Sequence, residues 1–319
     1  MKMGSYIYNR ILDTRGFECR IWRFIRRVYI KIFNDPDCLL KIHGKREILG
    51  PLSHELPFYL KVLKRYDQVI CRVSDYLHNH SGGSICAIDV GANIGDTVFA
   101  IYQNENDQIL AIEPNPKFFR YLEINTKDFG SIQIVDVVCS DQRENKKLSF
   151  DNKGGPASTI IGGTDRESKT LDILCAEYFK NQKVEFIKID TDGYDFMVLK
   201  GAKKIIERDE PIVLFECDVF NNDEYLSDIT EAFSIFKSCK YAKCIAYDHV
   251  GNLMGIFDLD EVESFKQYVF YQLTSSFYYF DLLMIPSKSL DLIKMEVNFF
   301  AQSCSNSGLR DQALQCFPN

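Results

Sequence analysis

The sequence predicts an α/β protein built around a mainly parallel sheet, and three observations support this fold class. Short apolar runs recur from Ile85 onward, and segments with helical periodicity separate them, as in successive βαβ units. The runs lack strict alternation of apolar and polar residues, which is typical of strands covered on both faces. A glycine-containing turn follows the first run, at the position where open α/β sheets bind ligands.

The predicted strands and helices follow one another at short intervals. The strand candidates are residues 85–90, 108–114, 132–140, 183–191, 211–218, a late hairpin over 241–258, and 278–286. Helical periodicity marks residues 96–103, 115–127, 194–208 and 222–238. Residues 146–151 alternate as an edge strand does. The Gly-, Ser- and Thr-rich segment 151–170 is expected to form a loop, either a lid at the carboxyl edge of the sheet or a plain connector.

The pattern divides the chain into three parts. Residues 1–84 form a predicted N-terminal extension, in which residues 38–58 suggest short strands or loops and residues 59–80 suggest a helix. Residues 85–300 form the predicted sheet domain. Residues 301–319 are polar and are expected to fray.

The composition excludes several classes of protein. Hydrophobic residues make up 46% of the 319, which is enough for a substantial core. A net charge of −7 and a pI near 5.4 argue against nucleic acid as a partner. The eleven cysteines are scattered without paired spacing, which favours free thiols in a reducing cytosol. We expect no structural zinc at Cys239 and Cys244, no transmembrane helix and no cleaved signal peptide.

The N-terminal segment carries the opposite charge to the rest of the chain. Residues 1–32 contain eight Lys and Arg against two acidic residues, a local charge of +6. Over residues 17–33, two apolar sets recur at helical spacing beside the arginines, which predicts a basic amphipathic helix. The sets are Ile21, Ile25, Val28 and Ile32, and Trp22, Tyr29 and Phe33. This helix is expected either to pack on the sheet domain or a dimer mate, or to lie on the anionic inner face of a membrane.

The turn "DVGANIG", from Asp89 to Gly95, is better suited to a cationic ligand than to a phosphate. Gly91 and Gly95 allow the backbone to bend and to approach a ligand closely. The turn lacks the second close glycine of a dinucleotide fingerprint and the lysine of a P-loop. Asp89 and Asp96 flank the turn with negative charge, which phosphate sites avoid.

S-adenosyl-L-methionine (SAM) fits these features because it carries a sulfonium group, an ammonium group and a ribose diol. Glu113 ends the second strand candidate, where an acidic residue binds a ribose diol in many nucleotide-binding folds. The alternative role of Glu113 is to cap the helix that begins at residues 114–116. The ordered set of Asp89, Gly91, Gly95 and Glu113 therefore predicts a SAM site.

Six segments of the chain resemble the FkbM family of SAM-dependent methyltransferases and occur in that family's order. They are "IDVGANIGDTV", "AIEPNPKFFRYLEIN", "KTLDIL", "FIKIDTDGYDFMVLKGA", "PIVLFE" and "LLMIPS", and the resemblance covers roughly residues 85–286. The resemblance implies a Rossmann-like class I methyltransferase fold, a seven-stranded sheet whose last strand is antiparallel, and O-methylation, often of a sugar or polyketide hydroxyl. One departure is that the family's "IKIDVEG" is "IKIDTDG" here, so Thr191 and Asp192 replace Val and Glu.

The predicted cofactor contacts lie at the ends of the predicted strands. The resemblance places contacts to the adenine at residues 139–141, for which a simple turn is the alternative. The predicted cofactor-binding residues are Asp89, Gly91, Asn93, Gly95, Asp96, Glu113, Pro114, Asn115, Ser140, Asp141 and Asp190.

Methylation of a hydroxyl oxygen also needs a group that accepts the hydroxyl proton. Asp190, Asp192 and Asp195 crowd the end of the fourth strand, and we predict that Asp190 or Asp192 is this base. His249, in the late hairpin, is a further catalytic candidate. The alternatives are that Asp190 only orients the cofactor, or that the Asp-Thr-Asp triplet binds a divalent cation. Glu216 ends the fifth strand as a substrate contact or a supporting partner.

These features predict a SAM-dependent O-methyltransferase that acts on a saccharide or a related polyol. The acceptor pocket is expected to be formed by the N-terminal extension, the 151–170 segment and the late hairpin, with His54 and His249 overhanging it. One alternative is a catalytically idle relative that serves as a scaffold in a membrane-bound glycan assembly. Another is an enzyme that uses NAD or a nucleotide sugar, against which the missing second glycine counts.

Overall fold

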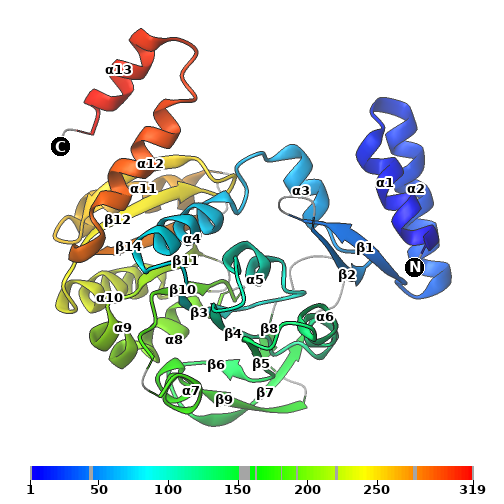
Figure 1. Ribbon diagram of the computed structural model, residues 1–319, viewed down its shortest axis with the longest axis horizontal. Helices are drawn as coiled ribbons and strands as arrows, with labels where there is room; N and C mark the ends of the chain where they lie inside the picture. Colours follow the sequence, from blue (N-terminus) through cyan, green and yellow to red (C-terminus); the bar gives the residue numbers. More distant parts are fainter. Residues whose placement is uncertain are drawn as a thin grey trace.

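The computed structural model describes residues 2–42, 46–150, 159–161, 164–180, 182–191, 193–219, 222–275 and 279–317. A twisted eight-stranded sheet lies at the centre of these residues, with helices on both of its faces (Figure 1). In spatial order its strands are β13 (Leu253–Asp258), β12 (Tyr241–Asp248), β14 (Tyr279–Pro286), β11 (Ile212–Asp218), β10 (Phe186–Ile189), β3 (Cys86–Val90), β4 (Gln108–Ile112) and β5 (Ile132–Val135).

The sheet topology confirms the predicted fold class. Strands β11, β10, β3, β4 and β5 are mutually parallel, and β14 pairs antiparallel with β11. The prediction of seven strands is corrected to eight, because both strands of the late hairpin join the sheet. Strand β12 pairs with β14, and β13 then pairs with β12 at the edge.

The helices cover both faces of the sheet and so explain the continuous apolar runs. On one face, core side chains come from α4 (Gln68–His80), α5 (Asp96–Ile101), α6 (Pro116–Thr126) and α12 (Asp291–Ala301). On the other face they come from α7 (Leu171–Tyr178), α8 (Asp195–Lys200), α9 (Lys203–Asp209), α10 (Tyr225–Ser238) and α11 (Val262–Thr274). Within β3, Cys86, Ile88 and Val90 point to the second face, and Ala87 points to the first. Asp89 therefore lies on the face that α4 and α5 cover.

The predicted third strand is wrong in its second half. Strand β5 ends at Val135, and the chain then leaves the main sheet. Residues Val138–Cys139 form β6, which pairs with β9 (Thr164–Lys169) in a separate four-stranded sheet. The predicted edge strand becomes β7 (Glu144–Phe150) of that sheet, and β8 (Thr159–Ile161) completes it. The expected loop over 151–170 thus contains two strands, while its residues 151–158 and 162–163 lie outside the described residues.

The N-terminal extension holds more regular structure than its sequence pattern predicts. Helix α1 (Lys2–Asp13), which we did not predict, precedes the predicted basic helix α2 (Gly16–Phe33). Strands β1 (Asp37–Lys41) and β2 (Glu47–Pro51) form a hairpin. The helix predicted over 59–80 is two helices, α3 (Leu56–Val62) and α4. The first ends at Leu63, whose ψ of 87° is not helical, and the second begins after Asp67, which has a positive φ of 56°.

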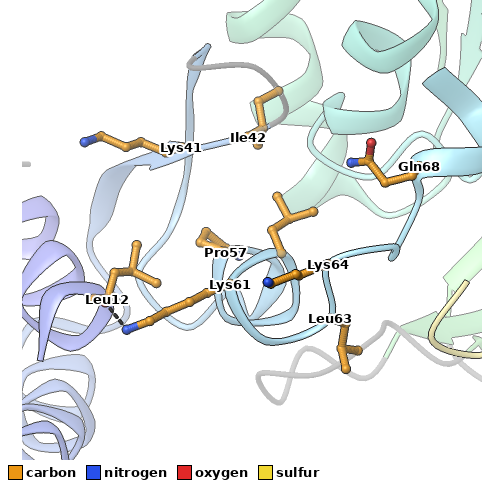
Figure 2. A pocket seen from close by; sticks show the side chains of 9 residues that line it. Leu12, Lys41, Ile42, Pro57, Lys61, Leu63, Lys64 and Gln68 are labelled. Atoms are coloured by element: carbon orange, nitrogen blue, oxygen red, sulfur yellow. Dashed lines mark hydrogen bonds between the residues drawn. The ribbon is translucent and has the colours of Figure 1, made fainter. Parts of the chain in front are cut away.

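One apolar cluster joins this extension to the sheet domain. It contains residues of α1, β1, β2 and α3 together with Ile94, Phe118 and Tyr121. Lys61 of α3 donates to the carbonyl of Leu12 at the end of α1, and a cavity of about 390 Å³ lies beside this contact (Figure 2). The cavity is lined by Leu12, Lys41, Ile42, Pro57, Leu60, Lys61, Leu63, Lys64 and Gln68.

The expectation of a frayed C-terminal tail is corrected, because residues Ser307–Gln315 form helix α13. Asn306 begins this helix by accepting a hydrogen bond from the Leu309 N–H through its side chain.

None of the helices in the described part of the chain is long and apolar enough to span a bilayer. All eleven cysteines are free thiols.

Candidate active site

The candidate site lies at the carboxyl ends of β3, β4 and β10, where the strand order of the sheet reverses. Strand β3 is flanked by β4 on one side and β10 on the other. From β3 the chain first adds β4 and β5 on one side, and later adds β10 and β11 on the other side. Open α/β sheets bind ligands at the point where the strand order reverses in this way. Most of the residues predicted for the cofactor follow these three strands.

The glycine turn after β3 has a backbone that most residues would not adopt. Gly91, Asn93 and Gly95 have φ values of 81°, 48° and 93°. Glycine adopts this left-handed region without strain, and asparagine tolerates it better than most residues. The N–H groups of Gly91 and Ala92 both donate to the carbonyl of Ile112, which ties the turn to the end of β4.

Gly91 also lies very close to the end of β10. A Cβ atom at this position would stand 1.7 Å from the carbonyl oxygen of Asp190. This separation is far below van der Waals contact, so only glycine fits while the two strand ends keep their spacing. The turn and the Asp190 backbone are therefore packed against each other.

Glu113 holds the glycine turn and the loop after β4 together. Its Oε2 accepts a hydrogen bond of 2.8 Å from the Asn93 N–H, and its Oε1 accepts one of 2.7 Å from the Asn115 N–H. The side chain is buried, and burial raises its pKa to about 7. Asn115, rather than Glu113, is the cap of α6, because its side chain accepts from the Lys117 N–H. The alternative role of Glu113 as that helix cap is therefore wrong.

Lys188 is the basic residue at the centre of the site. Its Nζ lies 3.5 Å from Asp89 Oδ1 and 3.1 Å from Asp190 Oδ2. Asp89 and Lys188 are paired across β3 and β10, and Asp190 lies two residues further along the chain. Asp89 is fully buried and also accepts from the Thr97 hydroxyl, whereas 43% of the Asp190 side chain is exposed. Asp190 is therefore the carboxylate of this group that an acceptor can reach.

Replacing Lys188 with methionine should lower the free energy of unfolding by about 3 kcal/mol, because Asp89 would lose the cation that offsets its burial. Chemical denaturation at pH 7.5 measures this loss. The double variant Lys188→Met/Asp89→Asn should recover part of it, since no buried charge then lacks a partner. Lys266→Met removes an exposed pair with Glu263 and should cost less than about 0.5 kcal/mol. A loss as small as this control in Lys188→Met would contradict the proposed arrangement.

Four residues of this edge were not found from the sequence. They are Tyr66, Asp67, Tyr279 and Asp281, which come from the segment before α4 and from β14. Burial raises the pKa of Asp281 to about 8 and raises that of Asp67 well above its usual range, and in both the charge of Asp190 adds to the effect. Asp281 had a sequence signal, as an acidic residue within an apolar strand, whereas the segment before α4 had none.

Lys188 is the cation that opposes these shifts. It lowers the pKa of Asp67, Asp89 and Asp281 against the effect of their burial. Several carboxyl groups thus share one ammonium group, and burial is the main cause of their raised pKa values, to which the charges of neighbouring carboxylates add. An additional cation bound at this edge would be stabilised.

The turn after β10 is held by Asp195. Its Oδ2 accepts hydrogen bonds from the Thr191 hydroxyl and the Gly193 N–H, at 3.0 and 3.4 Å. Burial and the nearby charge of Asp190 raise its pKa to about 7. Asp192, the second predicted base, lies outside the described residues, so the choice between Asp190 and Asp192 stays a prediction.

The two histidines expected near the pocket lie at opposite sides of the site. His54 Nε2 lies 3.3 Å from Asn93 Oδ1, and burial lowers its pKa to about 4, so it is neutral near pH 7. His249 lies in the turn between β12 and β13, with its ring centroid 6.1 Å from that of Tyr279. The structure thus brings the N-terminal extension and the late hairpin to the two flanks of the strand ends.

The remaining predicted contacts lie beside β4 and the small sheet. Asp96 is buried in the first turn of α5. Arg166 of β9 donates to the carbonyl of Pro114 and to Asp136. Ser140 and Asp141 follow β6 rather than the end of the third strand of the main sheet, and Ser140 Oγ donates to Asp141 at 3.0 Å. Their predicted adenine contacts stay a prediction, and Asp136 is the residue that directly follows β5.

The other candidates can also be placed. Glu216 lies within β11 and is paired in register with Asp281 of β14, which puts it beside the acidic edge. Across the described ranges, no group of three or more His, Cys, Asp or Glu side chains is arranged to hold a metal ion.

The fold and this site define the class of protein. A doubly wound sheet with an antiparallel strand beside β11, and with acidic side chains at the ends of β3, β4 and β10, has the architecture of the class I methyltransferases. Residues 89–242 match the model of the methyltransferase FkbM domain. The match covers just under half of the chain, and over these residues the chain is similar to the methyltransferase FkbM domain.

Three solved structures are among those that this chain matches. The FkbM methyltransferase from Methylobacillus flagellatus KT has 16% identity and a TM-score of 0.36, over 59% of this chain and 54% of its own. A SAM-dependent methyltransferase from Agrobacterium tumefaciens has 6% identity and a TM-score of 0.39, over 79% and 70%. Aeropyrum pernix fibrillarin, in complex with natively bound SAM, has 12% identity and a TM-score of 0.32, over 63% and 66%. This chain thus spans about half the length of the M. flagellatus protein, and no curated protein matches it.

Proposed function

We propose that this protein transfers the methyl group of SAM to a hydroxyl of a saccharide or a related polyol. The observation that carries the proposal is the acidic edge around Lys188, where buried and partly buried carboxyl groups with raised pKa values favour an additional cation. A sulfonium cofactor supplies such a cation. The FkbM family match over residues 89–242 supports the same assignment.

The residues at the strand ends fit this cofactor. Each carboxylate oxygen of Glu113 accepts one hydrogen bond from a backbone N–H, so each keeps a lone pair that can accept from a ribose hydroxyl. Asp89 Oδ1 and Asp195 Oδ1 are buried and accept no hydrogen bond from the described residues, although Asp89 Oδ1 forms an ion pair with Lys188 Nζ at 3.5 Å. The glycine turn brings backbone close to the same edge. Glu113 would hold the ribose, and the Asp89 side of the site would face the cationic end of the cofactor.

Bound SAM would supply an activated methyl group, and the chain's own residues would align and deprotonate the acceptor. Asp190 accepts the hydroxyl proton at its exposed carboxylate as the oxygen attacks. The buried Lys188 fixes the position of this carboxylate, because its Nζ pairs with Asp190 Oδ2 and is itself positioned by an ion pair with Asp89. Lys188 is thus a positioning residue, and Asp190 is the catalytic base.

A polyol acceptor is supported by the side chains around Asp190. Asp67, Asp281, Tyr66 and Tyr279 interact electrostatically with it, and carboxyl and phenol groups bind neutral hydroxyl-rich molecules by hydrogen bonds. The same carboxyl groups would repel a phosphorylated acceptor at this edge. Transfer of labelled methyl groups from SAM to a panel of neutral saccharides tests the acceptor class. Methylation of anionic or protein acceptors alone would contradict it, and SAM binding without any transfer would favour a scaffold role.

Glu113→Gln should weaken the binding of SAM and S-adenosylhomocysteine by roughly 10- to 100-fold, because the amide accepts fewer hydrogen bonds than the carboxylate and carries no charge. Titration calorimetry at pH 8 measures this change, with Glu123→Gln on the exposed face of α6 as the control. The pKa of Glu113 is about 7, so its carboxylate protonates as the pH falls from 8 to 6. Affinity should fall over this range in the unmodified protein and less in Glu113→Gln. Equal affinities for the two proteins at pH 8 would refute the ribose-binding role.

A further inference from the structure

Helix α2 presents three distinct faces, of which one attaches it to the protein. Trp22, Ile25, Tyr29 and Ile30 pack against the apolar cluster that joins the extension to the sheet domain. Arg26 is buried on this face, where it donates to the carbonyls of Leu52 and His54 and pairs with Glu55 at 2.7 Å. This inward face therefore accounts for only some of the apolar residues of the helix.

The second face is an apolar stripe that points to solvent. Its members recur at intervals of four, three, four and four residues and so share one side of the helix. They are Phe17, Ile21, Phe24, Val28 and Ile32, with exposed fractions of 78%, 42%, 66%, 39% and 67%. Exposed apolar residues that are scattered singly are ordinary, but five in one continuous stripe indicate a binding surface. Figure 1 shows α1 and α2 as a helical pair at the periphery of the molecule.

The third face is basic and borders the stripe. Arg20, Arg23, Arg27 and Lys31 are exposed. Arg20, Arg27 and Lys31 lie on the side of the stripe away from the inward face, whereas the guanidinium of Arg23 stacks over the Phe58 ring, 5.6 Å from its centroid. The acidic residue of this helix, Glu18, is paired with Arg10 of α1. Because residues 1–32 carry +6 and the whole chain carries −7, the remaining residues carry −13. The net positive charge therefore lies in residues 1–32, and half of their eight basic residues are the exposed Arg20, Arg23, Arg27 and Lys31 of α2.

We propose that α2 docks this protein on an anionic lipid bilayer, with its apolar stripe inserted among the headgroups and its basic face against the lipid phosphates. A helix with separate apolar and cationic faces lies in the plane of such a surface, and its charged face is attracted by anionic lipids. The helix stays attached to the rest of the protein through its inward face, which packs against the apolar cluster. No helix needs to span the bilayer for this mode of binding.

A second copy of the chain fits this surface less well. A symmetric dimer would place the same patch of each copy against the other, and the four exposed basic residues would then face their own counterparts. An anionic surface instead matches the charge beside the stripe. A lipid bilayer also accepts phenylalanine and isoleucine side chains without a complementary shape, because its interior is fluid.

Sedimentation of the full chain with vesicles tests this proposal. Vesicles of phosphatidylcholine with 30% phosphatidylglycerol should bind the protein, and pure phosphatidylcholine vesicles should bind it at least about 20-fold more weakly. Raising the salt to 0.5 M should also weaken binding, since the Debye length falls to about 4 Å. Phe17→Ser/Phe24→Ser should reduce binding by at least about tenfold, and Arg20→Gln/Arg27→Gln by about 20-fold.

The matched control is Phe270→Ser/Leu273→Ser on α11. These residues are also exposed, at 68% and 50%, but they have no comparable set of basic residues beside them. This variant should bind vesicles as the unmodified protein does. The proposal is overturned if anionic vesicles bind no better than neutral ones, or if the α2 and α11 variants lose binding equally. It is also overturned if light scattering shows a dimer that Phe17→Ser/Phe24→Ser dissociates while vesicle binding is absent.

Discussion

Asp190→Asn is expected to lower the rate of methyl transfer by about 10²- to 10⁴-fold, the range that a positioned general base contributes. Asparagine has nearly the same shape and can still accept a hydrogen bond from Lys188, but it cannot take a proton from the acceptor hydroxyl. Since 43% of the Asp190 side chain is exposed, the substitution should leave the core unchanged. The affinity for SAM should therefore stay within about tenfold.

Single-turnover rates with labelled SAM, combined with calorimetry, separate this role from its alternative. If Asp190 only orients the cofactor, the variant should lose SAM affinity while the rate at saturation is preserved. Asp260→Asn is a suitable control because its side chain is exposed and pairs with Lys237 on the surface. A rate within threefold of the unmodified protein would exclude Asp190 as the base and would favour Asp192, the other predicted base.

Gly91→Ala is expected to abolish detectable cofactor binding and to lower the free energy of unfolding by more than about 3 kcal/mol. Two effects add here: the φ of 81° is strained for any residue with a Cβ, and that Cβ would stand 1.7 Å from the Asp190 carbonyl oxygen. The turn and the end of β10 would have to separate. Such a movement would displace both the glycine turn and the Asp190 carboxylate.

Thermal unfolding and SAM titration measure the two parts of this prediction. Gly130→Ala is the matched control, because a Cβ at Gly130 meets no atom within 4 Å. It should change the melting temperature only slightly. Binding of SAM by Gly91→Ala within threefold of the unmodified protein would show that the close approach of the two strand ends is not required.

Local patterns in the sequence were sufficient for the core of the fold. The apolar runs at β3, β4, β10 and β11 were each predicted, because strands covered on both faces need continuous apolar residues. The positive φ values of Gly91 and Gly95 match the residue types at those positions. Glu113 was also predicted, since an acidic residue at a strand end beside a glycine turn carries its own signal.

The errors arose where distant parts of the chain meet. Val138 and Cys139 are as apolar as the strand before them, so their sequence could not show that they pair with residues 168–169 in another sheet. The helix predicted over 59–80 is interrupted between Leu63 and Asp67, although no local pattern required the non-helical backbone of either residue. Both choices are made by tertiary pairing, which overrides a local preference worth only a fraction of a kcal/mol per residue.

The candidate site shows the same division. Lys188 is a conspicuous charge within an apolar strand, but its role depends on Asp89, which lies on a neighbouring strand 99 residues earlier. Asp67 and Asp281 join the site from the segment before α4 and from the last strand of the main sheet, more than 200 residues apart. Their raised pKa values come from burial and from the charges of nearby carboxylates such as Asp190, and these effects exist only after the chain has folded.

The sequence by itself determined the α/β class, the glycine turn, the place of Glu113 at the end of a strand and the basic amphipathic character of α2. Each depends on residue types within a few positions of one another. The tertiary structure alone decided which apolar residues of α2 pack inward and which form the exposed stripe, and which carboxyl groups surround Lys188. The physical reason is that burial and charge interaction act through space, and the groups they couple are far apart along the chain.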